Sequence, residues 1–251
     1  MDRKPPRVQI GVLGGMGPRA THYFLGELLQ SVERLWKPQK DQDYPDLHVR
    51  YACFLPDRTA SFEGDPQPFL KVFQRELEML VDLGCNPIVI PCITAHAALD
   101  ALNSAFPVID IRRLVAEFVD RQWTNARIGL LATRGSRITG VTSKFSEDPN
   151  RIISLDAENE DALMRFVYGE AKAAKVVGPP TSLLRIVDSL QQRGADIIIA
   201  GCTEVEMHLS PFLSDNPQIV FPLRLVASTL ADLFHRTSSN NAVSPVRRCP
   251  S

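Results

Sequence analysis

Short apolar runs alternate along the chain with longer segments whose apolar residues recur at helical spacing. The short runs predict buried strands, and the longer segments predict helices that cover them, as in βαβ units around a parallel sheet. Strands are expected at 8–13, 47–54, 88–90, 128–132, 152–155, 197–200 and at the start of 219–234. Helices are expected at 19–35, 68–83, 94–102, 161–174, 182–192 and over the rest of 219–234. The pattern therefore indicates an α/β protein.

Two parts of the chain resemble each other. Residues 84–92 align with residues 194–202, and in both segments a glycine precedes an apolar run that leads to a cysteine, Cys92 or Cys202. Residues 8–13 likewise match residues 126–131. We expect two similar Rossmann-like domains related by a pseudo-twofold axis. The active site is expected in the cleft between them, because open α/β sheets bind ligands at the carboxyl ends of their strands.

The domain boundaries follow from this repeat. The first domain is expected to comprise residues 1–112 together with residues 217–236, and it carries Cys92. The second domain, residues 113–216, carries Cys202. Residues 237–251 are rich in Ser, Asn, Pro and Arg, a composition typical of a disordered tail. The last predicted strand and helix are therefore expected to return to the first domain.

Composition and charge exclude several classes of partner. The 251 residues are 44% hydrophobic and 23% charged, as in globular proteins, and 28 Lys and Arg balance 29 Asp and Glu. Such a balance gives no basic surface for nucleic acid or an anionic membrane. No apolar run reaches the ~20 residues that span a bilayer, and the first residues lack the apolar core of a signal peptide. We expect a cytoplasmic protein without nucleic-acid or membrane partners, and we leave open whether it forms a homodimer.

The five cysteines do not form a disulfide or zinc pattern, because their number is odd and no pair has the spacing C-x-x-C. No metal site is expected. Cys92 and Cys202 occupy equivalent positions in the repeat, each at the end of a predicted strand and before a helical segment. A helix N-terminus favours thiolate over thiol, below the ordinary pKa of ~8.5. Cys53, Cys85 and Cys249 have no such counterpart and are expected to be structural.

Two opposed thiols suit 1,1-proton transfer at a stereocentre, because a base removes the proton from one face while an acid returns a proton to the other. The carbanion that forms beside a carboxylate needs positive charge or N–H donors around that carboxylate. Thr94 and Thr203 follow the two cysteines closely, and their hydroxyls can donate to a carboxylate or cap a helix. The pattern favours a racemase or an epimerase.

Four segments together resemble the aspartate/glutamate racemase family. In chain order they are residues 14–18 (GGMGP), 55–59 (LPDRT), 91–96 (PCITAH) and 201–204 (GCTE). The resemblance extends from Val8 to about Phe234. It implies a pyridoxal-independent amino-acid racemase that uses no cofactor and has Cys92 and Cys202 as its two acid/base groups.

The resemblance also implies which residues bind the substrate. Arg58 and Lys172 match positions that hold substrate carboxylates, and two cations suit an acidic amino acid such as aspartate or glutamate. The other residues expected to bind the substrate are Met16, Gly17, Pro18, Thr94, Ser136 and Thr203.

Three further residues, Ile93, His96 and Glu204, are expected to contact the substrate-binding and catalytic residues and to hold them in position. The family usually carries Asn directly after its first cysteine, where this chain has Ile93, so substrate binding is expected to differ. His96 lies four residues after Cys92 on the same helix face, where a lone histidine is more often structural than a base. Glu204 is expected to support the second thiol or to cap a helix turn.

Residues 15–20 (GMGPRA) also fit the dinucleotide-binding fingerprint G-x-G-x-x-A. That fold needs an acidic residue about 20 positions further on, at the end of the second strand. Here this stretch is predicted to be the end of a helix and a polar loop. A glycine turn that holds a carboxylate at a helix N-terminus explains the same residues, so no cofactor is expected.

Three functions are compatible with these observations. The first is a cofactor-independent racemase that interconverts the L and D forms of an acidic amino acid. The second keeps the fold and changes the reaction to that of a maleate isomerase or a hydantoin racemase. The third is a protein that binds a small dicarboxylate or amino acid without turning it over.

Overall fold

The computed structural model describes residues 8–102 and 105–240. Its strands form two separate sheets, and every pair within them is parallel. The first sheet has the order β2-β1-β3, with β1 (Gln9–Gly14), β2 (Asp46–Tyr51) and β3 (Ile88–Val89). The second has the order β5-β4-β6-β7, with β4 (Ile128–Leu130), β5 (Ile152–Ile153), β6 (Ile197–Ile199) and β7 (Ile219–Val220). The predicted α/β class is confirmed.

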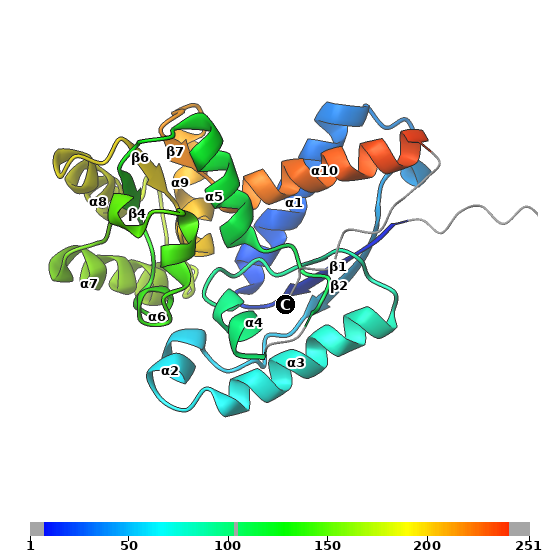
Figure 1. The fold of residues 1–251 in the computed structure, drawn as a ribbon, viewed down its shortest axis with the longest axis horizontal. Helices are drawn as coiled ribbons and strands as arrows, with labels where there is room; N and C mark the ends of the chain where they lie inside the picture. The colour runs from blue at the N-terminus through cyan, green and yellow to red at the C-terminus, as the bar shows by residue number, and fades with distance from the viewer. Residues whose placement is uncertain (1–7, 103–104, 241–251) are drawn as a thin grey trace, which may run out of the picture.

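Helices cover both sheets (Figure 1). The helices that follow strands of the first sheet are α1 (Pro18–Trp36), α2 (Arg58–Glu63), α3 (Gln67–Asp82), α4 (His96–Leu102) and α5 (Ile111–Gln122). The later helices are α6 (Arg134–Ile138), α7 (Ala157–Arg165), α8 (Thr181–Gln192), α9 (Thr203–Leu213) and α10 (Pro222–Asn240). Short 3₁₀ turns lie at η1 (Asp41–Asp43), η2 (Val141–Phe145) and η3 (Pro149–Arg151), and a π-helical segment, η4 (Phe166–Ala171), extends α7.

The internal repeat seen in the sequence corresponds to equivalent packing in the two sheets. Gly11 of β1 lies beside Ile88 of β3, and Gly129 of β4 lies beside Ile198 of β6. A Cβ at Gly11 would come within 2.9 Å of Cys85, and a Cβ at Gly129 would come within 2.5 Å of Ile198. Both central strands therefore need glycine where the neighbouring segment crosses closely.

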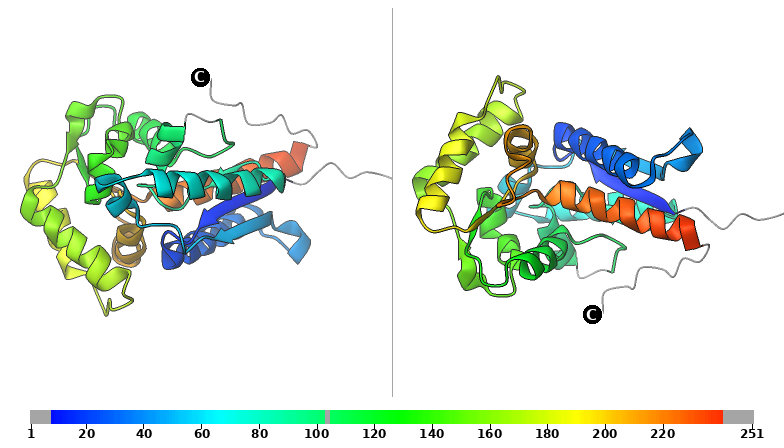
Figure 2. Two further views of the ribbon diagram at one scale, coloured as in Figure 1. Left: turned by 90° about the horizontal axis from the view of Figure 1, so that it is seen from below. Right: turned by 90° about the horizontal axis from the view of Figure 1, so that it is seen from above.

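The two halves exchange a helix with each other. α5 follows a short bridge between Ile88 and Val108 at the edge of the first sheet, yet its buried residues Ile111, Val115 and Val119 belong to a core that includes strands of both sheets. α10 follows β7 of the second sheet and packs along α1 of the first half, as Figure 2 shows from above. Each half is therefore held to the other by a helix that leaves its own sheet.

Two boundaries differ from the sequence-based expectation. Residues 217–236 were assigned to the first domain, but β7 pairs with β6, with Ile219 beside Ile198, so the crossing to the first half begins only at α10. The predicted disordered tail began at residue 237, but α10 continues through Asn240. The rest of that tail, including Cys249, lies outside the described residues.

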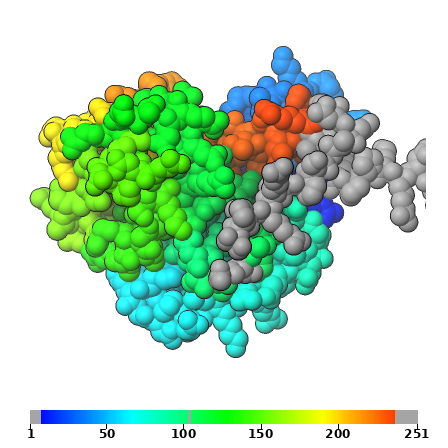
Figure 3. Space-filling model, viewed as in Figure 1, coloured from blue at the N-terminus to red at the C-terminus, as the bar shows by residue number. Residues whose placement is uncertain are grey.

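The halves meet closely at α2 and α6, which Figure 3 shows as cyan and green surfaces in contact. Gly135 of α6 faces Thr59 of α2 so closely that a Cβ on Gly135 would lie 2.5 Å from the Thr59 hydroxyl oxygen. Glycine at this position lets the two halves approach. In the described part of the chain, no helix is long and apolar enough to cross a membrane.

Candidate active site

A small pocket between the two halves contains both candidate cysteines. We call it the inner pocket. Its lining residues are Met16, Asp57, Arg58, Thr59, Cys92, Ile93, Thr94, Thr133, Val167, Tyr168, Lys172, Cys202, Thr203 and Glu204. Its volume is about 20 Å³. One buried water needs ~10–15 Å³, so the inner pocket as it stands is too small to hold an amino acid.

Cys202 lies at the N-cap of α9, where its extended backbone follows directly from β6. Its thiol donates a hydrogen bond to Glu204 Oε2 at 3.3 Å, and the Thr203 hydroxyl donates to the same oxygen at 3.1 Å. All three side chains are buried. The Glu204 carboxylate therefore lies in direct hydrogen-bond contact with the Cys202 thiol, and its role there stays a prediction.

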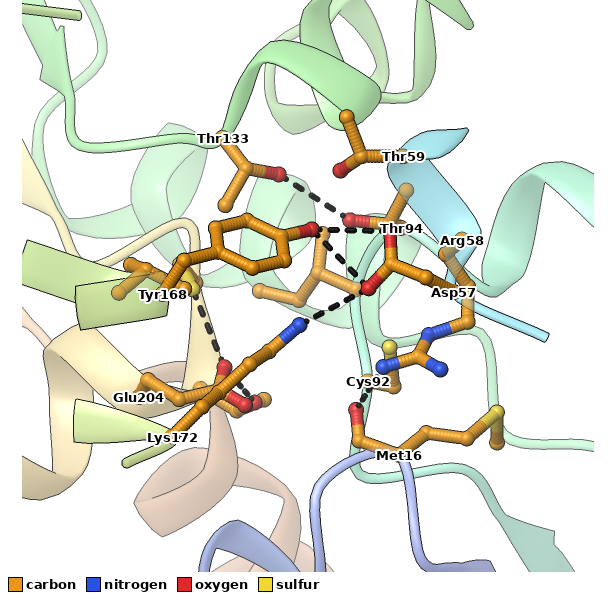
Figure 4. A pocket seen from close by; sticks show the side chains of 14 residues that line it. Met16, Asp57, Arg58, Thr59, Cys92, Thr94, Thr133, Tyr168, Lys172 and Glu204 are labelled. Carbon is orange, nitrogen blue, oxygen red and sulfur yellow. Dashed lines mark hydrogen bonds and ion pairs between the residues drawn. The ribbon is translucent and has the colours of Figure 1, made fainter. Parts of the chain in front are cut away.

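Cys92 lies in the turn between β3 and α4, and the guanidinium of Arg58 approaches it (Figure 4). Arg58 is buried and donates to the carbonyl oxygens of Pro56 at 3.1 Å and Met16 at 3.0 Å. Its Nε is buried without a hydrogen-bond partner. A buried donor on a charged group is costly to leave unpaired, so an anion that paired with Arg58 here would remove that cost.

The two thiols have different electrostatic neighbours. Burial raises the pKa of Cys92, the charge of Arg58 opposes that rise, the Glu204 carboxylate adds to it, and the Ala95 N–H and Lys172 lower it. Burial also raises the pKa of Cys202 well above its ordinary value, and the nearby Glu204 carboxylate raises it further. The expectation that helix N-termini would leave both thiols with lowered pKa values is therefore wrong, because burial outweighs the backbone N–H groups that face the sulfur atoms.

Asp57 joins the two halves across the pocket. It caps the N-terminus of α2 by accepting the Ala60 N–H at 3.1 Å. From the opposite half it accepts the Tyr168 hydroxyl at 2.9 Å and Lys172 Nζ at 3.1 Å, as Figure 4 shows. The Ala60 N–H and the Lys172 charge lower the Asp57 pKa although burial opposes them, so the carboxylate is ionised. Lys172 Nζ also lies 3.9 Å from the centre of the Tyr168 ring.

The structure brings most of the sequence-predicted binding residues to the inner pocket, but not all of them. Ser136 is buried behind the pocket wall, where it hydrogen bonds Thr94 at 2.7 Å and Thr133 at 3.2 Å. It therefore does not line the pocket, whereas Thr133 does. Gly17 and Pro18 line a neighbouring hollow instead of the inner pocket.

His96 has a structural place behind Cys92. Its ring is fully buried, Nδ1 lies 3.0 Å from the Cys92 carbonyl oxygen, and Nε2 accepts the Ile111 N–H at 3.4 Å. These partners assign the ring proton to Nδ1. Burial lowers the pKa of His96, so the ring is neutral and holds the Cys92 turn against α5.

The sequence did not single out Asp57 or Tyr168 as site residues, although signals for both were present. Asp57 precedes Arg58 and Thr59 in the pattern of a helix N-cap, and the structure places a helix there. Tyr168 lies four residues before Lys172, a spacing at which helical side chains meet. Among the described residues, no group of His, Cys, Asp or Glu could hold a metal ion.

The fold and the site together define a two-domain α/β protein with a pair of thiols in the pocket between its halves. The chain belongs to the Asp/Glu/Hydantoin racemase family, whose model matches residues 13–231. This membership confirms the expected resemblance and the expectation of an isomerase of the racemase type.

Individual relatives are distant in sequence. The chain is 22% identical over 225 residues to the broad specificity amino-acid racemase RacX of Bacillus subtilis, covering 88% of this chain and 96% of that protein. It is 26% identical over 205 residues to a glutamate racemase of Symbiobacterium thermophilum, covering 76% and 71% of the two chains. Among solved structures, the Picrophilus torridus aspartate racemase is similar with a TM-score of 0.74, 20% identity and coverage of 91% and 94%. The last of these similarities supports the fold alone.

Proposed function

We propose that this protein racemises an amino acid by proton transfer between Cys92 and Cys202, without a cofactor. The observation that carries the proposal is that both thiols line one pocket and have different direct neighbours, Arg58 at Cys92 and the Glu204 carboxylate at Cys202. A racemase needs this asymmetry at the start of each turnover, because one group must be a base while the other is an acid.

We infer the starting protonation states from these neighbours. Burial raises the pKa of Cys92, and Arg58 reduces the cost of forming its thiolate, whereas the Cys202 proton is held between sulfur and the Glu204 carboxylate. The Cys92 thiolate removes the α-proton of one enantiomer, which leaves a Cys92 thiol and an α-carbanion. The Cys202 thiol then gives its proton to the opposite face and becomes a thiolate. The product is the other enantiomer, and the reverse reaction starts from the exchanged protonation states.

Arg58 is the proposed partner of the substrate α-carboxylate. Its unpaired Nε and its position beside Cys92 place positive charge where the carbanion develops negative charge. The acidic amino acid expected from the sequence also needs Lys172 as a second anchor. Since Asp57 binds Lys172 in the structure, a side-chain carboxylate has to displace Asp57. Activity on aspartate and glutamate tests whether a substrate carboxylate displaces Asp57 from Lys172, so both amino acids are included among the first substrates.

The test is loss of the α-proton signal in D₂O from L- and D-aspartate, glutamate, alanine, leucine and methionine. The name of the Bacillus subtilis relative is the reason for a panel this broad. At least one amino acid should exchange its α-proton and racemise from both enantiomers. Cys85→Ala, which changes a buried cysteine outside the inner pocket, serves as the control and should exchange like the wild type. Turnover of maleate or a hydantoin without amino-acid exchange contradicts the proposal, and so does binding without any exchange.

A further inference from the structure

A second and much larger hollow, which we call the outer pocket, adjoins the inner pocket. Its volume is about 280 Å³, against about 20 Å³ for the inner pocket. Four residues line both hollows: Asp57, Arg58, Lys172 and Glu204. The two hollows therefore share one wall, and that wall consists of charged side chains from both halves.

The shared wall includes the contact that closes the inner pocket. Lys172 and Asp57 meet there at 3.1 Å with side chains that are about one quarter and one third exposed, 26% and 34%. A partly exposed ion pair of this kind is worth little, so it separates at low cost. When it separates, a substrate side chain can pass from the space beside Arg58 and Cys92 into the outer pocket, and the pair re-forms once the side chain is in place. A substrate whose α-carbon lies between the thiols then has room for its side chain in the outer pocket.

The rest of the outer pocket is largely apolar or small. Leu55, Met207, Ala20, Ala171 and Pro18 contribute carbon atoms, and Gly15 and Gly17 add no side chain. A Cβ at Gly15 would come within 2.6 Å of the Ala52 nitrogen, and Gly15 has a positive φ of 90°, so glycine is required in this turn. A small-molecule site typically combines such an apolar lining with a few fixed polar groups.

The charges of the shared wall are already matched, with two cations and two carboxylates. An amino acid that places its carboxylate on Arg58 and its ammonium near Glu204 lets Lys172 return to Asp57, its present partner. A charged side chain then has no buried group of opposite sign to meet. Arg19 also lines the outer pocket but is exposed, so its attraction for a side-chain carboxylate is screened by solvent.

We propose that the outer pocket receives the substrate side chain and that the preferred substrate is an amino acid with a long, uncharged, mainly apolar side chain, such as methionine or leucine. This inference rests on the proposed racemase function. It assigns specificity to Cys53 and Met207, which line the outer pocket but not the inner one.

The test fills the outer pocket from two lining positions, one in each half of the molecule. Cys53→Trp adds a large ring at an exposed position after β2, and Met207→Trp adds one from α9. In the wild type, kcat/KM for methionine should exceed that for alanine and for aspartate at least tenfold. Each Trp variant should lower the ratio of kcat/KM for methionine to that for alanine at least fivefold. Val177→Trp, at a 93% exposed position away from both pockets, should leave this ratio unchanged.

Circular dichroism of the variants verifies that they are folded before their rates are compared. Wild-type preference for aspartate over methionine overturns the inference and leaves the racemase proposal standing. So does an unchanged ratio in both folded Trp variants. If the wild type exchanges the α-proton of no amino acid, the racemase proposal fails, and the inference fails with it.

Discussion

Ile93 places a branched apolar side chain directly after Cys92 in the wall of the inner pocket, where it is 2% exposed. It cannot hydrogen bond a polar substrate atom, and leaving such an atom unpaired costs about 1–3 kcal/mol. That range corresponds to about a five- to hundredfold loss of affinity. We therefore expect weak activity on free aspartate. We also expect Ile93→Asn to raise kcat/KM for aspartate or glutamate several-fold.

Initial rates of racemisation, followed by polarimetry, measure this effect. Ile93→Val is the matched control, because it keeps an apolar branched side chain and supplies no amide. It should give no gain on aspartate. Strong racemisation of aspartate by the wild type that Ile93→Asn leaves unchanged would show that an amide at this position does no binding.

At the residue scale, sequence motifs predicted which residues meet in the inner pocket better than they predicted the contacts between those residues. Arg58, Lys172 and both cysteines stand in recognisable segments, and the structure places all four in one pocket. The role of Asp57 could not be seen in the same way. Its bond to Tyr168 joins residues 111 positions apart in the chain, and it depends on how the halves close.

At the element scale, α9 carries Cys202 at its start and a buried carboxylate, Glu206, one turn later. Glu206 Oε2 accepts the Leu223 N–H at 2.7 Å and Oε1 accepts the Arg224 N–H at 2.9 Å. These N–H groups belong to the first turn of α10, which has no intrahelical acceptor for them. Tyr23 of α1 donates to Glu206 Oε1 at 3.5 Å. Glu206 therefore joins α9, α10 and α1 where the two halves meet.

Burial raises the pKa of Glu206 from 4.5 to about 8, although the N–H groups of Leu223 and Arg224 oppose the rise. The charge of Glu27 on α1 raises it further, and that of Arg224 lowers it. Between about pH 4.5 and pH 8 the folded chain keeps a proton that the unfolded chain has released. The contribution of Glu206 to the free energy of unfolding therefore falls as pH rises through this window.

Urea unfolding of the wild type and Glu206→Gln at pH values across this window measures the effect. The glutamine has no proton to lose, so the wild type should lose stability relative to Glu206→Gln as pH rises. The change can reach about 1.4 kcal/mol per pH unit, the limit for one proton. Glu78→Gln, an exposed position on α3, is the control and should follow the wild type. If the free energies of unfolding of the wild type and Glu206→Gln change with pH in parallel, the raised pKa of Glu206 is contradicted.

Strong apolar periodicity predicted α1, α3 and α8 to within a few residues, but α5, which is as long as α8, was not predicted. Shorter or more polar elements were missed, including α2 and α6, whose few residues carry no full helical repeat. The predicted helix 161–174 begins earlier, because Asp156 caps α7 by accepting the Asn159 N–H at 2.9 Å. It then changes to the π-helical η4, which carries Tyr168. The spacing of apolar residues along the sequence does not show a change from α-helix to π-helix.

At the scale of the whole molecule, the repeat predicted two similar halves, because each sheet needs glycine at the same place in its central strand. The exchange of α5 and α10 between the halves depends on packing among distant segments. The sequence therefore did not show that β7 stays with the second sheet, and residues 217–236 were assigned as a whole to the first domain. The closed inner pocket likewise depends on contacts between the halves, at α2 with α6 and at Asp57 with Lys172. The volume of that pocket could not be predicted from the sequence.

The central claim is that each half supplies one thiol to opposite faces of the same substrate carbon. Exchange of the α-proton in D₂O, measured separately for the two enantiomers with Cys92→Ser and Cys202→Ser, tests it most directly. Both variants should lose racemisation, and each should retain exchange of one enantiomer only, opposite in the two variants, because the remaining thiol still serves its own face. Racemisation at the wild-type rate by either variant, or retained exchange of the same enantiomer in both, would contradict the claim.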